Sequence, residues 1–220
     1  MIWMAGFTVI PLLMVFYYGL TDRSGAFTLA NILAISSSEH LKALWLSLAL
    51  AGVSTVICLV LAYPLALILR KRHIGKGSFV VFIFILPMWM NFLLRTMAWQ
   101  TLLEKNGVIN TFLTMLHLPN IAIINTPAAI ILGMVYNFLP FMVLPIYNTL
   151  AKIDDNVIQR GGRTGADNYQ TLTKILLPLS VPGIVSGITM VFVPALTTFV
   201  ISNLLGGSKI LLIGNVIEQE

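Results

Sequence analysis

Five long stretches without a charged side chain alternate with short polar segments along the chain. They cover residues 1–21, 43–69, 77–94, 106–151 and 175–208. An α-helix rises about 1.5 Å per residue and the hydrocarbon core of a bilayer is about 30 Å thick, so roughly 20 apolar residues cross it. Each stretch is therefore long enough to predict a membrane-spanning helix.

The fourth stretch is too long for one span, and its first part contains helix-breaking residues. Gly107, Pro119 and Pro127 interrupt the apolar pattern there. Between them an apolar face recurs at helical spacing, formed by Ile109, Phe112, Leu113 and Leu116. This face predicts a short amphipathic helix lying on the membrane surface. The predicted spans are then five, over 2–20, 42–69, 78–102, 127–150 and 180–204.

The composition also indicates a membrane protein. Of 220 residues, 58% are hydrophobic and 10% are charged, whereas soluble domains carry about 25% charged residues. We therefore expect an all-α fold, a polytopic bundle of transmembrane helices. The one cysteine, Cys58, lies within an apolar run and can form no intrachain disulfide. The histidines at 40, 73 and 117 lack the spacing of metal ligands, so no metal site is expected.

The basic residues gather in two loops and predict the orientation of the chain. The formal net charge is +5, and 8 of the 13 Lys and Arg residues lie in 70–76 and 152–174. Membrane topology explains this charge, so no nucleic-acid partner is expected. The positive-inside rule places both loops, and the N-terminus, in the cytoplasm. A cleaved signal peptide is the alternative for residues 1–20, but no basic residue precedes the apolar run and Tyr17-Tyr18 make a poor cleavage site.

The long loop from 151 to 178 carries helical signals of its own. Asp154 and Asp155 are placed to cap one helix, and Asp167 with Gln170 forms a capping-box pattern for a second. Glycines between them permit a turn, so the loop predicts a helix-turn-helix held against the cytoplasmic face. The alternative is a polar linker without a fixed structure.

The spacing within this loop resembles a known signature. Gly165, nine intervening residues and then Ile175-Leu176-Leu177-Pro178 match the second half of the cytoplasmic motif of ABC importer permeases, which reads Glu-Ala-Ala, three residues, Gly, nine residues, Ile-x-Leu-Pro. The first half departs from it. The resemblance implies contact with an ATPase through Gln159, Arg160, Gly161, Gly165, Ala166 and Asp167.

The resemblance extends over nearly the whole chain and is to the spermidine/putrescine type of these permeases. The stretches that carry it are 87–100, 105–110, 137–142 and 205–217. It implies the type I importer permease fold, with five of the family's six spans present and a truncation before the last helix. Residues 1–40 are then the first transmembrane helix and a periplasmic loop, and 41–220 form the permease domain with its coupling loop 151–178.

The same resemblance implies a function and a set of partners. It implies a subunit of the bacterial inner membrane that forms the translocation path for spermidine, putrescine or a related polyamine. The implied partners are an ATPase dimer, a second homologous permease, a periplasmic substrate-binding protein and membrane lipid. ATP and Mg belong to the ATPase. For this chain the resemblance implies no cofactor and no catalytic site.

Six polar or aromatic residues in the predicted spans are candidates for lining the path. They are Trp89, Asn91, Arg95, Trp99, Tyr136 and Asn137. An arginine within a span is costly, so Arg95 either faces the pathway or reaches the membrane interface with its long side chain. Aromatic faces attract a cationic substrate. The alternative role for each aromatic residue is packing inside the bundle or a place in the aromatic belt at the membrane interface. The alternative role for each asparagine is a hydrogen bond to a neighbouring helix.

Two other functional classes remain as alternatives. A secondary transporter of a small organic solute typically has intramembrane acids and inverted repeats, and the predicted spans show neither. A membrane-embedded enzyme needs a catalytic constellation, which the sequence also lacks. The run Gly206-Gly207-Ser208-Lys209 does not have the spacing of a phosphate-binding loop.

Overall fold

A computed structural model describes residues 2–21, 25–29, 37–71, 86, 88–154, 156–157, 167–207 and 210–219 of the chain. Within these residues the fold is all-α, as predicted, and the β-structure is one isolated bridge between Thr21 and Phe27. The chain divides into two compact units, 1–45 and 46–220. The named helices are α1 (Ile2–Gly19), α3 (Ser38–Lys71), α5 (Phe92–Leu103), α6 (Val108–Met115), α7 (Pro127–Ala151), α9 (Asn168–Thr171), η2 (Leu172–Leu176), α10 (Leu177–Thr197), η3 (Ser202–Gly206) and α11 (Ile213–Gln219).

The first unit contains α1, which confirms the helix predicted over 2–20. It is apolar on every side, and large side chains such as Trp3 and Phe7 are exposed. A helix that is hydrophobic all round belongs in a protein interior or in lipid. Its apolar part over Gly6–Gly19 is shorter than a full span.

Three described helices are long and apolar enough to cross a membrane, namely 38–71, 127–151 and 169–197. The first two confirm the spans predicted over 42–69 and 127–150. The predicted span over 180–204 is displaced, because the helix begins before it and ends at Thr197, and Thr198 has an extended backbone with ψ 126°. This break lets η3 pack separately against α7, where Leu205 and Ile201 contact Gly133.

The prediction of one continuous helix over 78–102 is wrong at Asn91. Residues 78–85 lie outside the described part, and α5 begins only at Phe92. The side-chain oxygen of Asn91 accepts hydrogen bonds from the backbone N–H groups of Leu93 at 2.8 Å and Leu94 at 3.4 Å. Asparagine is among the favoured residues at this capping position, since it satisfies N–H groups that have no partner inside the helix.

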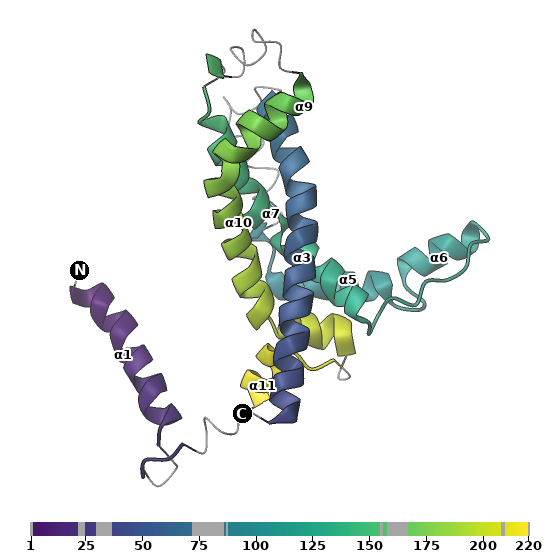
Figure 1. Ribbon diagram of the computed structural model, residues 1–220. Helices are drawn as coiled ribbons and strands as arrows, with labels where there is room; N and C mark the ends of the chain where they lie inside the picture. The colour runs from purple at the N-terminus through teal and green to yellow at the C-terminus, as the bar shows by residue number, and fades with distance from the viewer. Residues whose placement is uncertain are drawn as a thin grey trace. The chain divides into compact units, whose positions relative to one another are not determined.

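The core of the second unit is built around α7 (Figure 1). Its side chains Ile130, Met134, Met142 and Ile146 are fully buried. The face of α3 that lies in the core carries small side chains, among them Ala51, Ser54, Cys58 and Ala62, whereas Val56 and Val60 on other faces are exposed. Small residues inside and larger apolar residues outside are typical of helices that pack in lipid.

The contact between α7 and α10 depends on two glycines one turn apart. A Cβ atom on Gly183 would lie 2.5 Å from Thr149 Oγ1, and one on Gly187 would lie 2.7 Å from Met142 Sδ. Each distance is shorter than a real Cβ contact. Small residues at i and i+4 let the two backbones approach closely, as in other membrane helix pairs.

The described residues that flank the two basic loops lie at the same end of this unit. Arg70, at the end of α3, donates a hydrogen bond from Nη2 to the carbonyl oxygen of Ile153, 2.8 Å away, just after the end of α7. This bond joins the first basic segment to the second. It agrees with the predicted topology, in which both loops face the same side of the membrane.

Candidate functional site

The guanidinium group of Arg95 lies over the ring of Tyr136, with Cζ 5.9 Å from the ring centroid. Arg95 comes from α5 and Tyr136 from α7, and the arginine is 6% exposed. This separation is within the range of a cation–π interaction, which strengthens where water is excluded. The arginine therefore points its charge at an aromatic face of the neighbouring helix.

Trp99 completes an aromatic pair at the same place. It follows Arg95 by one turn of α5, and its ring meets that of Tyr136 at a centroid distance of 5.2 Å and an interplanar angle of 68°. Edge-to-face pairs of this kind are favourable because the positive edge of one ring meets the negative face of the other. Three of the six residues predicted to line a path are thus in one cluster, Arg95, Trp99 and Tyr136, called here the α5–α7 cluster.

Asn137, next to Tyr136 in sequence, is buried with one polar atom unsatisfied. Its Nδ2 donates a hydrogen bond to the carbonyl oxygen of Gly133 at 2.8 Å, and the residue is 1% exposed. Among the described residues, no group donates to its Oδ1. Buried polar atoms are nearly always paired, so this oxygen is an acceptor available to a donor that the described part of the chain does not supply.

The other two predicted path residues have different surroundings. Asn91 is exposed and caps α5. Trp89 is 75% exposed and precedes that cap. The structure therefore gives Asn91 a local task in starting the helix, and it leaves Trp89 on the surface of the described chain.

A second polar network lies near the end of the described chain, and the sequence did not predict it. Asn215 Nδ2 donates to Asn203 Oδ1 at 2.5 Å, and Asn203 Nδ2 donates to Glu218 Oε2 at 3.2 Å. The backbone N–H of Ile213 donates to Ser47 Oγ at 2.8 Å, which ties this segment to α3. The one available signal was the presence of Asn203 and Asn215 in otherwise apolar sequence.

The predicted coupling loop is described only at its two ends. Gln159, Arg160, Gly161, Gly165 and Ala166 lie outside the described residues. The cap predicted from Asp167 is confirmed, and Asp154 accepts a capping bond as well, whereas Asp155 and residues 158–160 of the first predicted helix lie outside the described residues. Asp154 Oδ1 accepts a hydrogen bond from the N–H of Asn156 at 2.9 Å, and Asp167 Oδ1 accepts one from the N–H of Gln170 at 2.7 Å.

The helix that Asp167 caps is not a separate short helix, contrary to the prediction. It continues from α9 through the π-helical turn η2 into α10 and ends at Thr197. A proline ring in a regular α-helix clashes with the carbonyl four residues earlier, and for Pro178 that residue is Lys174, within η2. The wider π turn relieves this clash, so the helix passes through the proline without a break.

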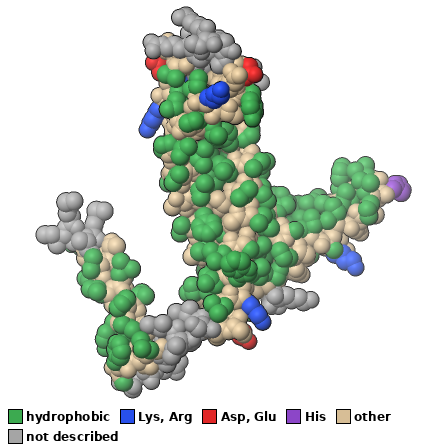
Figure 2. Space-filling view, in the orientation of Figure 1, with side chains coloured by type: hydrophobic (Ala, Val, Ile, Leu, Met, Phe, Trp, Pro, Cys, Tyr) green, Lys and Arg blue, Asp and Glu red, His purple; other side chains and the backbone are tan. Residues whose placement is uncertain are grey.

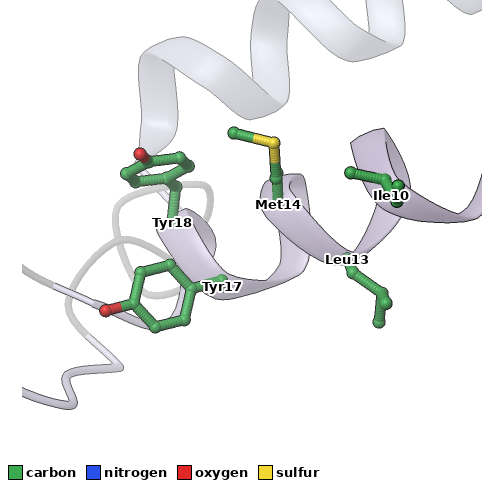
Figure 3. A pocket seen from close by; sticks show the side chains of 5 residues that line it. All are labelled: Ile10, Leu13, Met14, Tyr17 and Tyr18. Atoms are coloured by element: carbon green, nitrogen blue, oxygen red, sulfur yellow. The ribbon is translucent and has the colours of Figure 1, made fainter. Parts of the chain in front are cut away.

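A shallow pocket on α1 is unrelated to these residues. Figure 3 shows its lining, Ile10, Leu13, Met14, Tyr17 and Tyr18, which all come from that one helix. Binding sites typically place several polar groups around an enclosed ligand. An open surface formed by one helix has no such arrangement, and we assign it no ligand.

The described residues contain no group of three or more His, Cys, Asp or Glu side chains that could hold a metal ion. The prediction of no metal site concerns the whole chain and stays a prediction.

Curated proteins similar to this chain are transport permeases. The chain is 36% identical to the spermidine/putrescine transport system permease protein PotB of Haemophilus influenzae, over 99% of the chain and 79% of the relative. It is 37% identical to the Escherichia coli K12 protein of the same name, over 99% of the chain and 82% of the relative. It is 31% identical to the inner membrane ABC transporter permease protein YdcU of E. coli K12, over 88% of the chain and 66% of that protein. No protein-family model matches the chain.

Proposed function

Because the chain belongs to the family of spermidine/putrescine transport system permeases, we propose that it forms part of the translocation path of a polyamine-importing ABC transporter. It is a multi-pass membrane protein, and its relatives are transport permeases rather than enzymes. The proposed location is the bacterial inner membrane. The proposed partners are an ATPase dimer that binds ATP and Mg, a second homologous permease, a periplasmic substrate-binding protein and membrane lipid.

The observation that carries the proposal is the α5–α7 cluster, together with Asn137, which follows Tyr136 in the sequence. A polyamine is a flexible chain of methylene groups between protonated amines, so it needs aromatic faces and hydrogen-bond acceptors from its path. The face of Tyr136 already accepts the cationic group of Arg95 at 5.9 Å. The Oδ1 atom of Asn137 supplies a buried acceptor nearby in sequence. One ammonium group of the substrate can use the ring face and another the buried acceptor.

Arg95 has a separate role in this proposal. Its fixed positive charge disfavours small cations that approach without the aromatic contacts that a polyamine makes, because like charges repel more strongly where water is scarce. A polyamine competes with Arg95 for the face of Tyr136. Carboxylates that balance the substrate charge come from the partner permease, since the spans predicted from this sequence contain no acid.

The coupling to ATP hydrolysis is proposed to run through the helix that begins after Asp167. That helix continues without a break to Thr197, so a displacement at its start reaches the membrane interior directly. We place the ATPase contact on Gln159, Arg160, Gly161, Gly165, Ala166 and Asp167. The helix also packs against α7 through Gly183 and Gly187, and α7 carries Tyr136 and Asn137.

A reconstituted transporter tests this function against the alternative of a secondary transporter. The chain is assembled with its partner permease, ATPase and binding protein in liposomes, and uptake of labelled putrescine and spermidine is measured. Uptake should require hydrolysable ATP and the binding protein, and it should persist when ion gradients are collapsed. Uptake that needs an ion gradient and proceeds without ATP would reject the proposal and support the secondary transporter.

A further inference from the structure

Residues 104–121, called here the arm, contain α6 and the segment that returns from it. One buried side chain, Asn110, holds the two ends of the arm together. Its Nδ2 donates to the carbonyl oxygens of Glu104 at 3.1 Å and Ile121 at 3.0 Å, and its Oδ1 accepts from the N–H of Ile121 at 2.8 Å. Both amide donors and the carbonyl oxygen of this side chain are thus used, and the arm has a fixed shape.

Two further contacts hold the arm in that shape. A Cβ atom on Gly107 would lie 2.7 Å from the carbonyl oxygen of Leu102 and 2.9 Å from that of Glu104, so only glycine permits this close turn after α5. Thr114 Oγ1 donates to Asn120 Oδ1 at 2.9 Å, across the base of the return. The arm therefore needs no partner to order it, which lowers the entropic cost of placing it against a surface.

One side of the arm is apolar and unusually exposed. Its exposed fractions are 64% for Val108, 61% for Phe112, 72% for Met115 and 54% for Leu116. Thr111 and Thr114 lie at the other exposed positions of α6. Figure 2 shows hydrophobic side chains gathered along one side of the arm and a basic side chain on the other. Contiguous exposed apolar surface of this kind marks an interaction site.

The position of the arm identifies the surface that it meets. It precedes the start of α7, and the basic loops lie at the opposite end of that helix, where Arg70 binds the carbonyl oxygen of Ile153. The arm extends from the end of α5 away from α7 (Figure 1). On α5, which leads into the arm, Leu94 and Met97 are exposed as well. The helix before the arm therefore also has apolar side chains available to lipid.

We propose that the arm lies in the lipid–water interface on the membrane face opposite the basic loops, with Phe112 and Met115 among the acyl chains. Amphipathic helices in this position bury their apolar side about 5–10 Å into the boundary between headgroups and acyl chains. Glu104 and Lys105 are the charged residues of the arm, and their charges cancel. Burial of apolar surface therefore holds the arm in place, and the charge of the lipid headgroups contributes little.

The placement is tested by fluorescence quenching on the assembled importer in lipid nanodiscs. Cys58 is replaced by alanine, and an environment-sensitive dye is attached at Met115→Cys. Thr114→Cys is the matched control, because it is exposed and lies about 100° round the same helix, away from the apolar side. The hydrogen bonds of Asn110 that hold the arm remain in this variant. Val60→Cys on α3 is the reference for the membrane interior. Each sample is quenched by lipids that carry a nitroxide at a shallow or a deep acyl carbon, and by aqueous iodide. Native uptake by each unlabelled variant shows that it folds.

The expected result separates the three positions. The dye at 115 should be quenched about twofold more by the shallow lipid nitroxide than by the deep one, as a depth of about 5–10 Å requires. The dye at 60 should show the reverse order, and the dye at 114 should respond mainly to iodide. The pattern should be the same in neutral and in anionic lipid. Equal access of iodide to positions 114 and 115 would overturn the proposal. So would shielding of position 115 from both quenchers, which would place a protein subunit on the arm.

Discussion

Thr149 on α7 occupies the space that a side chain at position 183 of α10 would need, since a Cβ atom on Gly183 would be 2.5 Å from Thr149 Oγ1. The same Cβ would be 2.8 Å from the carbonyl oxygen of Pro145. Backbone atoms of a packed helix cannot move aside easily, so the absence of a side chain at 183 sets the distance between these two helices.

Gly183→Ala should therefore destabilise the protein by about 1–3 kcal/mol, the usual effect of overpacking a tight contact. The matched control is Gly52→Ala on α3, where a Cβ meets nothing within 4 Å. Thermal unfolding in the same detergent compares the two. Equal melting temperatures for both variants would show that α7 and α10 do not pack as closely as described.

The aromatic pair of the α5–α7 cluster should matter more for transport than for assembly. Tyr136→Ala and Trp99→Ala each remove one ring of a pair whose centroids are 5.2 Å apart. If the rings hold a substrate ammonium group by about 0.5–2 kcal/mol, uptake at low substrate falls by roughly 2–30-fold. Tyr136→Phe keeps the ring and should retain most uptake. Loss of copurification with the ATPase in the alanine variants would instead assign both rings to packing.

Removal of the charge on Arg95 should make the membrane leakier to cations. The guanidinium lies 5.9 Å from the Tyr136 centroid and is 6% exposed, so its charge acts where screening by water is weak. Arg95→Gln should raise the ATP-independent efflux of putrescine from loaded liposomes, whereas Arg95→Lys keeps the charge and should not. Unchanged efflux from the glutamine variant would favour the alternative in which Arg95 reaches the membrane interface.

The cap at Asp167 should influence how well ATP hydrolysis is coupled to transport. Asp167→Ala removes the acceptor that holds the N–H of Gln170 at 2.7 Å, and loss of such a cap destabilises a helix end by about 1 kcal/mol. We expect fewer substrate molecules imported per ATP hydrolysed. Asp167→Asn keeps a capping side chain and should behave like the wild type. If the Asp167→Ala variant imports as many substrate molecules per ATP as the wild type, the first turn of this helix does not transmit force from the ATPase.

The proposed ATPase contact around Gly165 is tested by two variants. Gly165→Val should uncouple transport from hydrolysis, because the family signature places a glycine at the turn and a β-branched residue restricts the backbone there. Replacing Gln159, Arg160 and Gly161 by Glu-Ala-Ala should preserve or strengthen binding of the ATPase, measured by copurification. Normal transport by the valine variant, or loss of binding after the triple change, would place the contact elsewhere.

Local sequence patterns determined the class of the fold and several helix boundaries. The spans over 42–69 and 127–150, the presence of helix α6 and the caps at Asp154 and Asp167 each depend on residues a few positions apart. The exposed apolar face of α6 was predicted only in part, because Ile109 is half-buried against the core and Leu113 is half-buried too. Hydrophobic length, helical periodicity and capping are all interactions of short range along the chain. They can therefore be predicted without knowledge of what lies beside the helix.

The site residues could be proposed from the sequence, but their grouping could not. Arg95 and Tyr136 are 41 positions apart in the sequence, and no local pattern indicates that one lies over the other. The same is true of Asn203, Asn215 and Glu218, which meet only because the chain turns between η3 and α11.

The tertiary structure also decided where three of the helices begin, end or continue. The sequence pattern favoured one helix through Asn91, one helix through Thr198, and a helix in the loop 151–178 separate from the span over 180–204. The structure instead begins a helix at Phe92, ends one at Thr197 and passes through Pro178 by a π turn. In each case hydropathy is the same for both outcomes. The cap formed by Asn91 decided the start at Phe92, and the packing of η3 against Gly133 decided the end at Thr197. Relief of the clash with the ring of Pro178 decided that the helix continues there. Each of these depends on atoms that are brought together only in three dimensions.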